Sequence, residues 1–311
     1  MNNDNKDKID KALTIGDKVI GYTKELISDL SKPQKMAESL LYSAIQQKSC
    51  IDEEDFKKAA LTLNVRKICR RAKNYYAILK KSDSLIEKNN NKNTVPDIDW
   101  LEIFEDLSSK VSDNSLQDIW ASILSKERLE AGSITKSMLN TFSLLDKYSA
   151  EAFGKLCSLT YKLKINDGRL YYIPLILYDD ILHNIISKYE GRTDYSKVKF
   201  PLEEYYSFLP KENEIDYLSD LNLVKPTTVH DESEVYSFEP MKCTFSVNNV
   251  SFEVNSIYDS KENYHFISTG QTFFTQTGLA LYHALSIKSY KYLYNVLEGY
   301  ISYVADNWSE I

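Results

Sequence analysis

Glycine is scarce in this chain, with nine in 311 residues. Phosphate-binding loops of the P-loop and dinucleotide-binding kinds depend on closely spaced glycines, and neither motif occurs here. The Gly-x-Ser-x-Gly pattern of a hydrolase nucleophile is absent as well. The sequence therefore predicts no catalytic residue and no cofactor, and it identifies no small-molecule ligand.

Cysteine and histidine are also few, with four of each. A disulfide framework in a chain of this size would use more cysteines, and structural zinc sites use closely spaced ligand pairs. The histidines show no His-x-x-x-His or similar spacing. We expect reduced thiols and no metal site, although distant residues could still converge. The residues concerned are Cys50, Cys69, Cys157, Cys243, His183, His230, His265 and His283.

Long apolar runs are missing. A membrane-spanning helix needs roughly 18 or more apolar residues, and the most apolar stretch, Leu170 to Leu177, ends just before Asp179 and Asp180. The first residues are polar and lack the apolar core of a signal peptide. We therefore expect a cytoplasmic protein with no membrane span.

Charge of one sign dominates only part of the chain. Residues 1–150 carry 24 Lys and Arg against 23 Asp and Glu, which leaves 14 against 22 in the remainder. The first half is thus nearly neutral at +1 and the second acidic at −8, together giving the net charge of −7. A polyanionic partner should meet the first half.

Helical periodicity prevails in the first ninety residues. Apolar positions predict helices near 9–30 and 36–47, and a long amphipathic helix from Val65 to Ile86. A polar, Asn- and Lys-rich stretch follows and predicts a linker at 89–96. We therefore expect an N-terminal helical segment at 1–88 and, beyond the linker, a helical core unit at 97–165.

Residues 166–311 have a mixed pattern. Leu170 to Leu177 is β-like, and a short helix is expected at 180–189. Two alternating runs flank Asn248-Asn249, which predicts a hairpin. A long helix is expected from Thr277 to about Val304. The fold class is therefore α+β, predominantly helical, with a C-terminal α/β module that ends in this long helix.

The order of motifs in the C-terminal module is that of a winged helix. Leu218, Leu221 and Leu223 end a helix, β segments follow, and Thr275 and Gly278 begin the next helix. The β region between them, about fifty residues long, exceeds an ordinary wing. We therefore expect a module that is winged-helix-like with an enlarged β region.

One segment resembles known families. Trp100, Gln117, Trp120, Glu127 and Gly132 stand in a pattern, with Gln117-x-x-Trp120-x-x-Ile123-Leu124-x-x-Glu127 at its centre, that resembles an uncharacterised bacterial domain of unknown function. The segment is also similar to abortive-infection alpha proteins. The resemblance implies a structural role for these residues, no catalytic role, and membership of a bacterial anti-phage defence system. The Tyr-rich β region departs from the family pattern.

A basic face is expected on the helix that begins near Val65. It comprises Arg66, Lys67, Arg70, Arg71 and Lys73. Cations one turn apart can meet successive phosphates of a nucleic acid, and Tyr75 and Tyr76 could supply stacking. The alternative is a solvated face, or one paired with acids such as those at 52–55.

Two further clusters have competing interpretations. Glu127 lies seven residues after Trp120, so it could be a buried general acid, or it could cap a helix or pair with Arg128. On the C-terminal helix, Tyr290, Tyr294 and Tyr300 could form a self-association surface, or they could pack against the β region.

These observations favour a non-enzymatic interaction or scaffold protein of anti-phage defence that acts through a protein partner or self-association. A nucleic-acid-binding regulator that uses the basic helix from Arg66 to Lys73 is the alternative. An enzyme with no recognisable motif is the third hypothesis.

Overall fold

The structure of the protein is a computed structural model, and it describes residues 53–87, 94–165, 168–177, 202–226, 237–238, 243–257, 265–266 and 272–311. Helices and an antiparallel sheet make the fold α+β, as the sequence predicts. The chain divides into two compact units between Ser143 and Leu144. The helices expected within 1–52 and at 180–189, and linker residues 89–93, lie outside the described residues.

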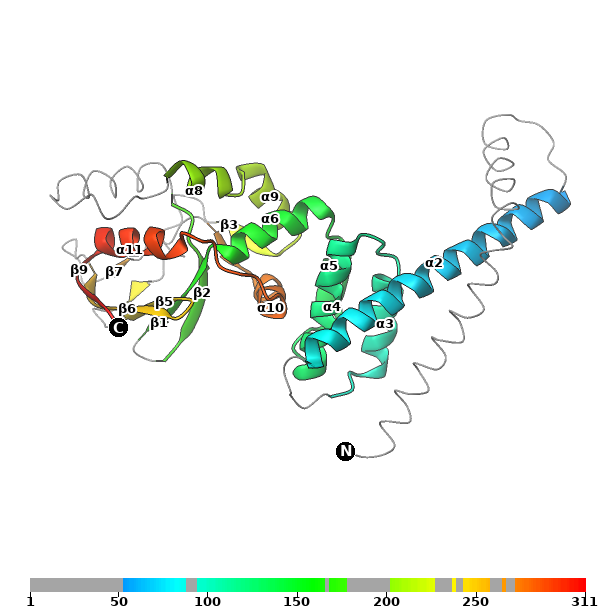
Figure 1. The fold of residues 1–311 in the computed structure, drawn as a ribbon, viewed down its shortest axis with the longest axis horizontal. Coiled ribbons are helices and arrows are strands. Elements are labelled where there is room, and N and C mark those ends of the chain that lie inside the picture. The colour runs from blue at the N-terminus through cyan, green and yellow to red at the C-terminus, as the bar shows by residue number, and fades with distance from the viewer. Residues whose placement is uncertain are drawn as a thin grey trace. The chain divides into compact units, whose positions relative to one another are not determined.

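The first unit is helical (Figure 1). Its long helix begins about a dozen residues before the predicted start, and the helices α3 and α4 pack against its C-terminal half. The N-terminal half of the long helix projects beyond them. The elements are α2 (Glu53–Glu87), α3 (Ile98–Ser108), α4 (Asn114–Leu129) and α5 (Lys136–Phe142).

An aromatic cluster forms the core of this unit. The ring of Phe104 stacks on Trp100 with 5.1 Å between centroids, and Trp120 meets Phe104 edge-on at 5.4 Å. All three side chains are buried. Aromatic burial of this kind gives each ring a large apolar contribution and a fixed orientation, so the tryptophans predicted as structural residues lie in the core.

The second unit begins with a helix and contains the sheet. Its helices are α6 (Lys147–Ser158), α8 (Leu202–Phe208), α9 (Glu212–Asp220), α10 (Gln276–Ala284) and α11 (Leu293–Val304). Its strands are β1 (Thr160–Ile165), β2 (Leu170–Pro174), β3 (Val224–Pro226), β4 (Ser237–Phe238), β5 (Cys243–Val247), β6 (Val250–Ile257), β7 (His265–Phe266), β8 (Thr272–Phe274) and β9 (Ala305–Glu310).

Five strands form an antiparallel sheet in the order β2-β1-β5-β6-β9, and two short pairs, β3–β8 and β4–β7, stand apart from it. The predicted hairpin is β5–β6, and Asn248 takes the positive φ of 52° that its turn requires. Leu293, Val296 and Leu297 of α11 belong to the same buried core as Phe245 and Phe252 of the sheet.

The C-terminal helix and several strands differ from the sequence prediction. Residues 285–292 are not helical, so α10 and α11 replace the single long helix that was expected from Thr277 to Val304. The segment between α10 and α11 instead contacts other elements. The Tyr290 amide donates to the Ser158 carbonyl at 2.8 Å, and the Tyr290 ring stacks on Phe208 of α8. Strands β1 and β9 were not predicted, and β9 follows α11 where the sequence suggested a final helix.

The two motifs of the expected winged-helix order meet at one corner. The Thr275 hydroxyl donates to the Asn222 carbonyl at 2.6 Å and accepts from the Gly278 amide at 3.0 Å, which caps α10. Strands β3 and β8 pair beside this contact. The order α9, β3, β8, α10 is therefore present, while the likeness to a winged helix stays a prediction.

None of the helices in the described part of the chain combines the length and the apolar character that a membrane crossing requires.

Candidate nucleic-acid interface on helix α2

Helix α2 contains a long stretch with cations and no anions. From Phe56 to Ser82 there are nine Lys or Arg residues and no Asp or Glu. Nearby carboxylates neutralise such a field. Within this stretch the sequence supplies none, but Asp106 of α3 pairs with Arg71 and Asp118 of α4 pairs with Lys81. The nine are Lys57, Lys58, Arg66, Lys67, Arg70, Arg71, Lys73, Lys80 and Lys81.

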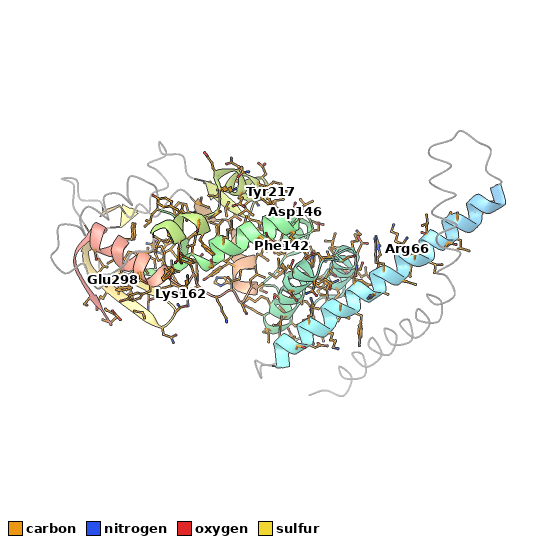
Figure 2. The ribbon with its side chains drawn as sticks, turned by 45° about the horizontal axis from the view of Figure 1, so that its top comes forward. Arg66, Phe142, Asp146, Lys162, Tyr217 and Glu298 are labelled. Atoms are coloured by element: carbon orange, nitrogen blue, oxygen red, sulfur yellow. The ribbon has the colours of Figure 1, made fainter. Side chains whose placement is uncertain are left out.

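Four of these cations form a line on one face of α2. Arg66, Arg70, Lys73 and Lys80 are four, three and seven residues apart, and at 3.6 residues per turn such spacings return to the same side of a helix. All four are exposed. We call these four residues the basic stripe, and Figure 2 shows Arg66 on the half of α2 beyond α3 and α4.

The two predicted stacking tyrosines differ in their surroundings. The ring of Tyr75 is turned towards the core, 6.4 Å from that of Phe104, and burial raises the pKa of its hydroxyl to about 12. Tyr76 keeps 37% of its surface exposed. Tyr76 is thus the accessible aromatic ring close to the basic stripe.

The remaining predicted cations do not join the stripe. Arg71 forms an ion pair with Asp106 of α3, with 3.3 Å between Nη1 and Oδ1. The pKa of the Asp106 carboxyl is lowered, chiefly by a hydrogen bond from Lys110 and further by the charges of Lys110 and Arg71. Lys67 is exposed on the flank of the helix. Of the five predicted residues, four are therefore exposed, and Arg71 joins α2 to α3.

A buried polar cluster fixes the orientation of α2 on its unit. The Asn74 amide donates to the Ser109 carbonyl at 3.0 Å and to the Ser112 hydroxyl at 3.1 Å. The Gln117 amide donates to the Val111 carbonyl at 3.0 Å and to the Asn74 side-chain oxygen at 3.4 Å. Gln117 therefore has a structural role, and these hydrogen bonds join α2 to the α3–α4 loop.

The carboxylate of Glu127 stabilises a loop. Glu127 is 3% exposed, and its two oxygens accept from the Gly132 amide at 2.7 Å, the Ile134 amide at 2.9 Å and the Ser133 hydroxyl at 3.3 Å. Gly132 takes a φ of +84°, in the region that favours glycine. The Trp100 indole donates to the Ile134 carbonyl of the same loop at 2.8 Å.

This geometry fits the structural interpretation of Glu127 and leaves little support for a general acid. Its carboxylate is used by backbone donors, as in other buried anion sites built from successive amides. Arg128 pairs with Asp83 of α2 at 2.5 Å, not with Glu127 as the sequence suggested.

The predicted interface tyrosines lie within the second unit. Tyr290 and Tyr300 are 7% and 0% exposed and belong to its core. Tyr294 packs its ring on Phe252 at 5.5 Å, and its hydroxyl donates to Glu310 at 2.9 Å. Tyr294 therefore packs against the β region, the alternative left open by the sequence, whereas the ring of Tyr290 packs on Phe208 of α8.

Cys69, Cys157 and Cys243 are buried free thiols, and burial raises the pKa of the Cys243 thiol to about 12. The ring of His283 meets Tyr172 edge-on at 4.5 Å. Within the described ranges, no group of three or more His, Cys, Asp or Glu side chains is placed to hold a metal ion.

Sequence reasoning missed Lys80 and Asn74. Continuing the helical count from Arg66, Arg70 and Lys73 through two further turns would have reached Lys80. The role of Asn74 had no comparable signal, because its partners lie 35 and 38 residues away and depend on the α3–α4 loop.

The chain belongs to a family described as "Protein of unknown function (DUF2806)", whose model matches residues 63–233. This match confirms the predicted membership of a domain-of-unknown-function family. The matched range contains the basic stripe, the aromatic core and the Glu127 loop. No curated protein and no solved structure matches the chain.

Proposed function

We propose that this protein is a non-enzymatic binding protein of a bacterial anti-phage defence system, and that it contacts nucleic acid through the basic stripe of α2. One observation carries the nucleic-acid proposal. Four exposed cations share one face of a helix in a stretch of sequence that contains nine cations and no anion.

The dimensions of the stripe suit a phosphate backbone. From Arg66 to Lys80 the helix rises about 21 Å, at about 1.5 Å per residue. Each cation that meets a phosphate releases condensed counterions, and the gain in entropy drives binding without base specificity. The exposed ring of Tyr76 supports stacking on an unpaired base.

Fluorescence anisotropy with a labelled oligonucleotide tests this proposal. The combined changes Arg66→Glu, Arg70→Glu and Lys73→Glu should weaken binding by at least about tenfold, because three phosphate contacts become repulsive. Arg71 is left unchanged, since its pairing with Asp106 is structural.

The matched control applies the same charge change to exposed lysines of the second unit: Lys147→Glu, Lys164→Glu and Lys288→Glu. The affinity of this control variant for the oligonucleotide should stay within about twofold of that of the unchanged protein. The change in net charge acts at long range, and salt screens it. Equal losses in both variants, or no loss in the first, would contradict binding by the basic stripe.

The defence setting is supported by the resemblance of the Gln117 to Glu127 helix and of Ser149-Ala150-Glu151-Ala152 to abortive-infection alpha proteins. Bacteria that express the gene, together with its neighbouring genes, should show a lower efficiency of phage plating than bacteria without it. Introducing the Arg66, Arg70 and Lys73 reversals should restore plating. Equal plating with and without the intact genes, across a panel of phages, would count against this setting.

A further inference from the structure

Tyr76 is an exposed aromatic ring beside the basic stripe. Its neighbour Tyr75 turns towards Phe104 and the core, whereas Tyr76 keeps 37% of its surface exposed. Within the described part of the chain, no ring contact and no hydrogen bond involves the Tyr76 side chain. Tyrosines usually pack the ring in a core or bond the hydroxyl to a partner. The Tyr76 ring is therefore available to a ligand.

Two cations of the basic stripe are the surface neighbours of Tyr76. Lys73 precedes it by three residues and Lys80 follows it by four, and residues three and four apart are adjacent on a helix. At about 100° per residue, the three side chains leave the helix within about 60° of one another. We call Lys73, Tyr76 and Lys80 the Lys-Tyr-Lys cluster.

The Lys-Tyr-Lys cluster faces away from the contact between α2 and the rest of its unit. Ile78 is fully buried and marks the side of α2 that packs against the unit. It leaves the helix about 140–160° away from each member of the cluster. All three members are exposed, so a ligand can approach them without displacing α3 or α4.

The two lysines of the cluster keep their charges for a partner. Within the described ranges, no ion pair involves Lys73 or Lys80. The next acid of α2, Asp83, forms its ion pair with Arg128 of α4. A polyanion therefore meets a cation on each side of an aromatic ring.

This order of cation, ring and cation suits a single strand of nucleic acid. A single strand alternates phosphates with bases that can turn outwards and stack on aromatic side chains. Along α2, Lys73 and Lys80 are about 10 Å apart, at about 1.5 Å per residue, and Tyr76 lies between them. Their flexible stems can reach phosphates on the two sides of one nucleotide while its base lies on the ring.

A duplex offers the ring no comparable partner. Its bases are paired and stacked inside, so Tyr76 would lie against sugar and phosphate. A duplex nevertheless carries one charge per about 1.7 Å of its axis, and this density favours it in a purely electrostatic contact. Stacking and charge alone therefore predict opposite preferences, which makes the two kinds of binding separable.

We propose that the basic stripe prefers single-stranded nucleic acid to a duplex, and that stacking of a base on Tyr76 determines this preference. The inference rests on the nucleic-acid binding proposed above. Phosphate contacts and stacking are common to DNA and RNA, so the shared chemistry covers both, and the experiment separates them.

Fluorescence anisotropy of the full chain is the test, with a labelled strand used alone and paired with its complement. The unchanged protein should bind the single strand at least about fivefold more tightly than the duplex. Tyr76→Leu should weaken binding of the single strand by about fivefold or more and leave binding of the duplex within about twofold. Tyr76→Phe keeps the ring and should bind like the unchanged protein.

Tyr206→Leu is the matched control, because Tyr206 is a tyrosine of helix α8 that keeps 41% of its surface exposed. This change should leave the affinity for both ligands within about twofold. Circular dichroism checks that each variant remains folded. Strands of DNA and of RNA are tested in parallel, and the sugar with which the single-strand preference appears identifies the ligand.

Two results would overturn the inference: a duplex that binds as tightly as the single strand, or a single-strand affinity that Tyr76→Leu leaves unchanged. If the Arg66, Arg70 and Lys73 reversals still weaken binding in that case, the proposed function stands without the preference. A chain that binds neither the single strand nor the duplex would contradict the proposed function itself, and the inference with it.

Discussion

At the scale of single residues, Gly278 allows a close approach between the start of α10 and the backbone of Leu223. A Cβ atom at this position would lie 1.8 Å from the carbonyl oxygen of Leu223, so no larger residue fits without moving the backbone. The neighbouring Thr275 hydroxyl donates to the Asn222 carbonyl and ties the start of α10 to the same turn. This contact explains the Thr-x-x-Gly spacing noted in the sequence.

Gly278→Ala should therefore destabilise the protein by about 3 kcal/mol or more, because the added methyl group overlaps main-chain atoms. Urea unfolding followed by circular dichroism measures the change. Gly154→Ala is the matched control, since Gly154 lies inside α6 and a methyl group added there would meet no atom within 4 Å. It should stabilise the helix by about 0.5–1 kcal/mol. Equal effects of the two changes would contradict the close approach.

Glu127 provides a second test at this scale. In Glu127 both side-chain oxygens accept hydrogen bonds from the loop at 132–134, whereas glutamine has only one oxygen. Glu127→Gln should therefore lower the free energy of unfolding by about 1–3 kcal/mol. Tryptophan fluorescence during urea unfolding reports on it, because Trp100 and Trp120 lie in the same core. Glu130→Gln, an exposed change at the other end of the Lys126 pair, should cost less than about 0.5 kcal/mol. A neutral Glu127→Gln would argue against the structural role.

The predictions from sequence succeed best where a side chain's role follows from local spacing. The burial of Trp100 and Trp120 follows from helical periodicity, and so does the shared face of Arg66, Arg70 and Lys73. The position of Arg71 off that face also follows from helical spacing. Its pairing with Asp106 could not be predicted, because Asp106 lies 35 residues away on another helix.

At the scale of elements, α11 and β9 bring two carboxylates together. The pKa of Glu298 is raised, first by burial and then by the negative charge of Glu310. A carboxyl whose pKa is higher in the folded state binds its proton more tightly there. Its contribution to stability is therefore fully present below its ordinary pKa of about 4.5 and is lost as pH rises through the folded pKa.

Glu298→Gln should remove this dependence and raise the urea midpoint at pH 7 relative to the original protein, with little difference near pH 4. Glu253→Gln on β6, a half-exposed position with no comparable burial of charge, serves as the control. An unchanged midpoint at both pH values would show that Glu298 is not destabilised in the folded protein.

Elements were predicted well where one pattern acts alone and poorly where tertiary contacts override it. The β5–β6 hairpin follows from alternation and from Asn248, and both are local. The single helix expected from Thr277 to Val304 is interrupted because Tyr290 bonds to Ser158 and packs on Phe208. Strand β1 does show a buried–exposed alternation from Tyr161 to Ile165, so its sequence carried a local signal that the prediction missed.

At the scale of the whole molecule, charge and exposure are unevenly divided. Nine cations of the first unit lie on α2 between Phe56 and Ser82, a stretch without Asp or Glu, while the residues after 150 carry the excess negative charge. The exposed cations of α2 account for the nucleic-acid binding that we propose. Composition predicted the division of charge, but only the structure shows which cations of α2 are exposed.

The salt dependence of oligonucleotide binding tests the central claim most directly. If the basic stripe meets three or four phosphates, a plot of the logarithm of the association constant against the logarithm of salt concentration should have a slope of about −2 to −3.5. Changing Arg70 to Gln should make the slope shallower by about 0.7–0.9, whereas changing Lys164 to Gln should not alter it. A slope near zero, or one that Arg70→Gln leaves unchanged, would contradict the account.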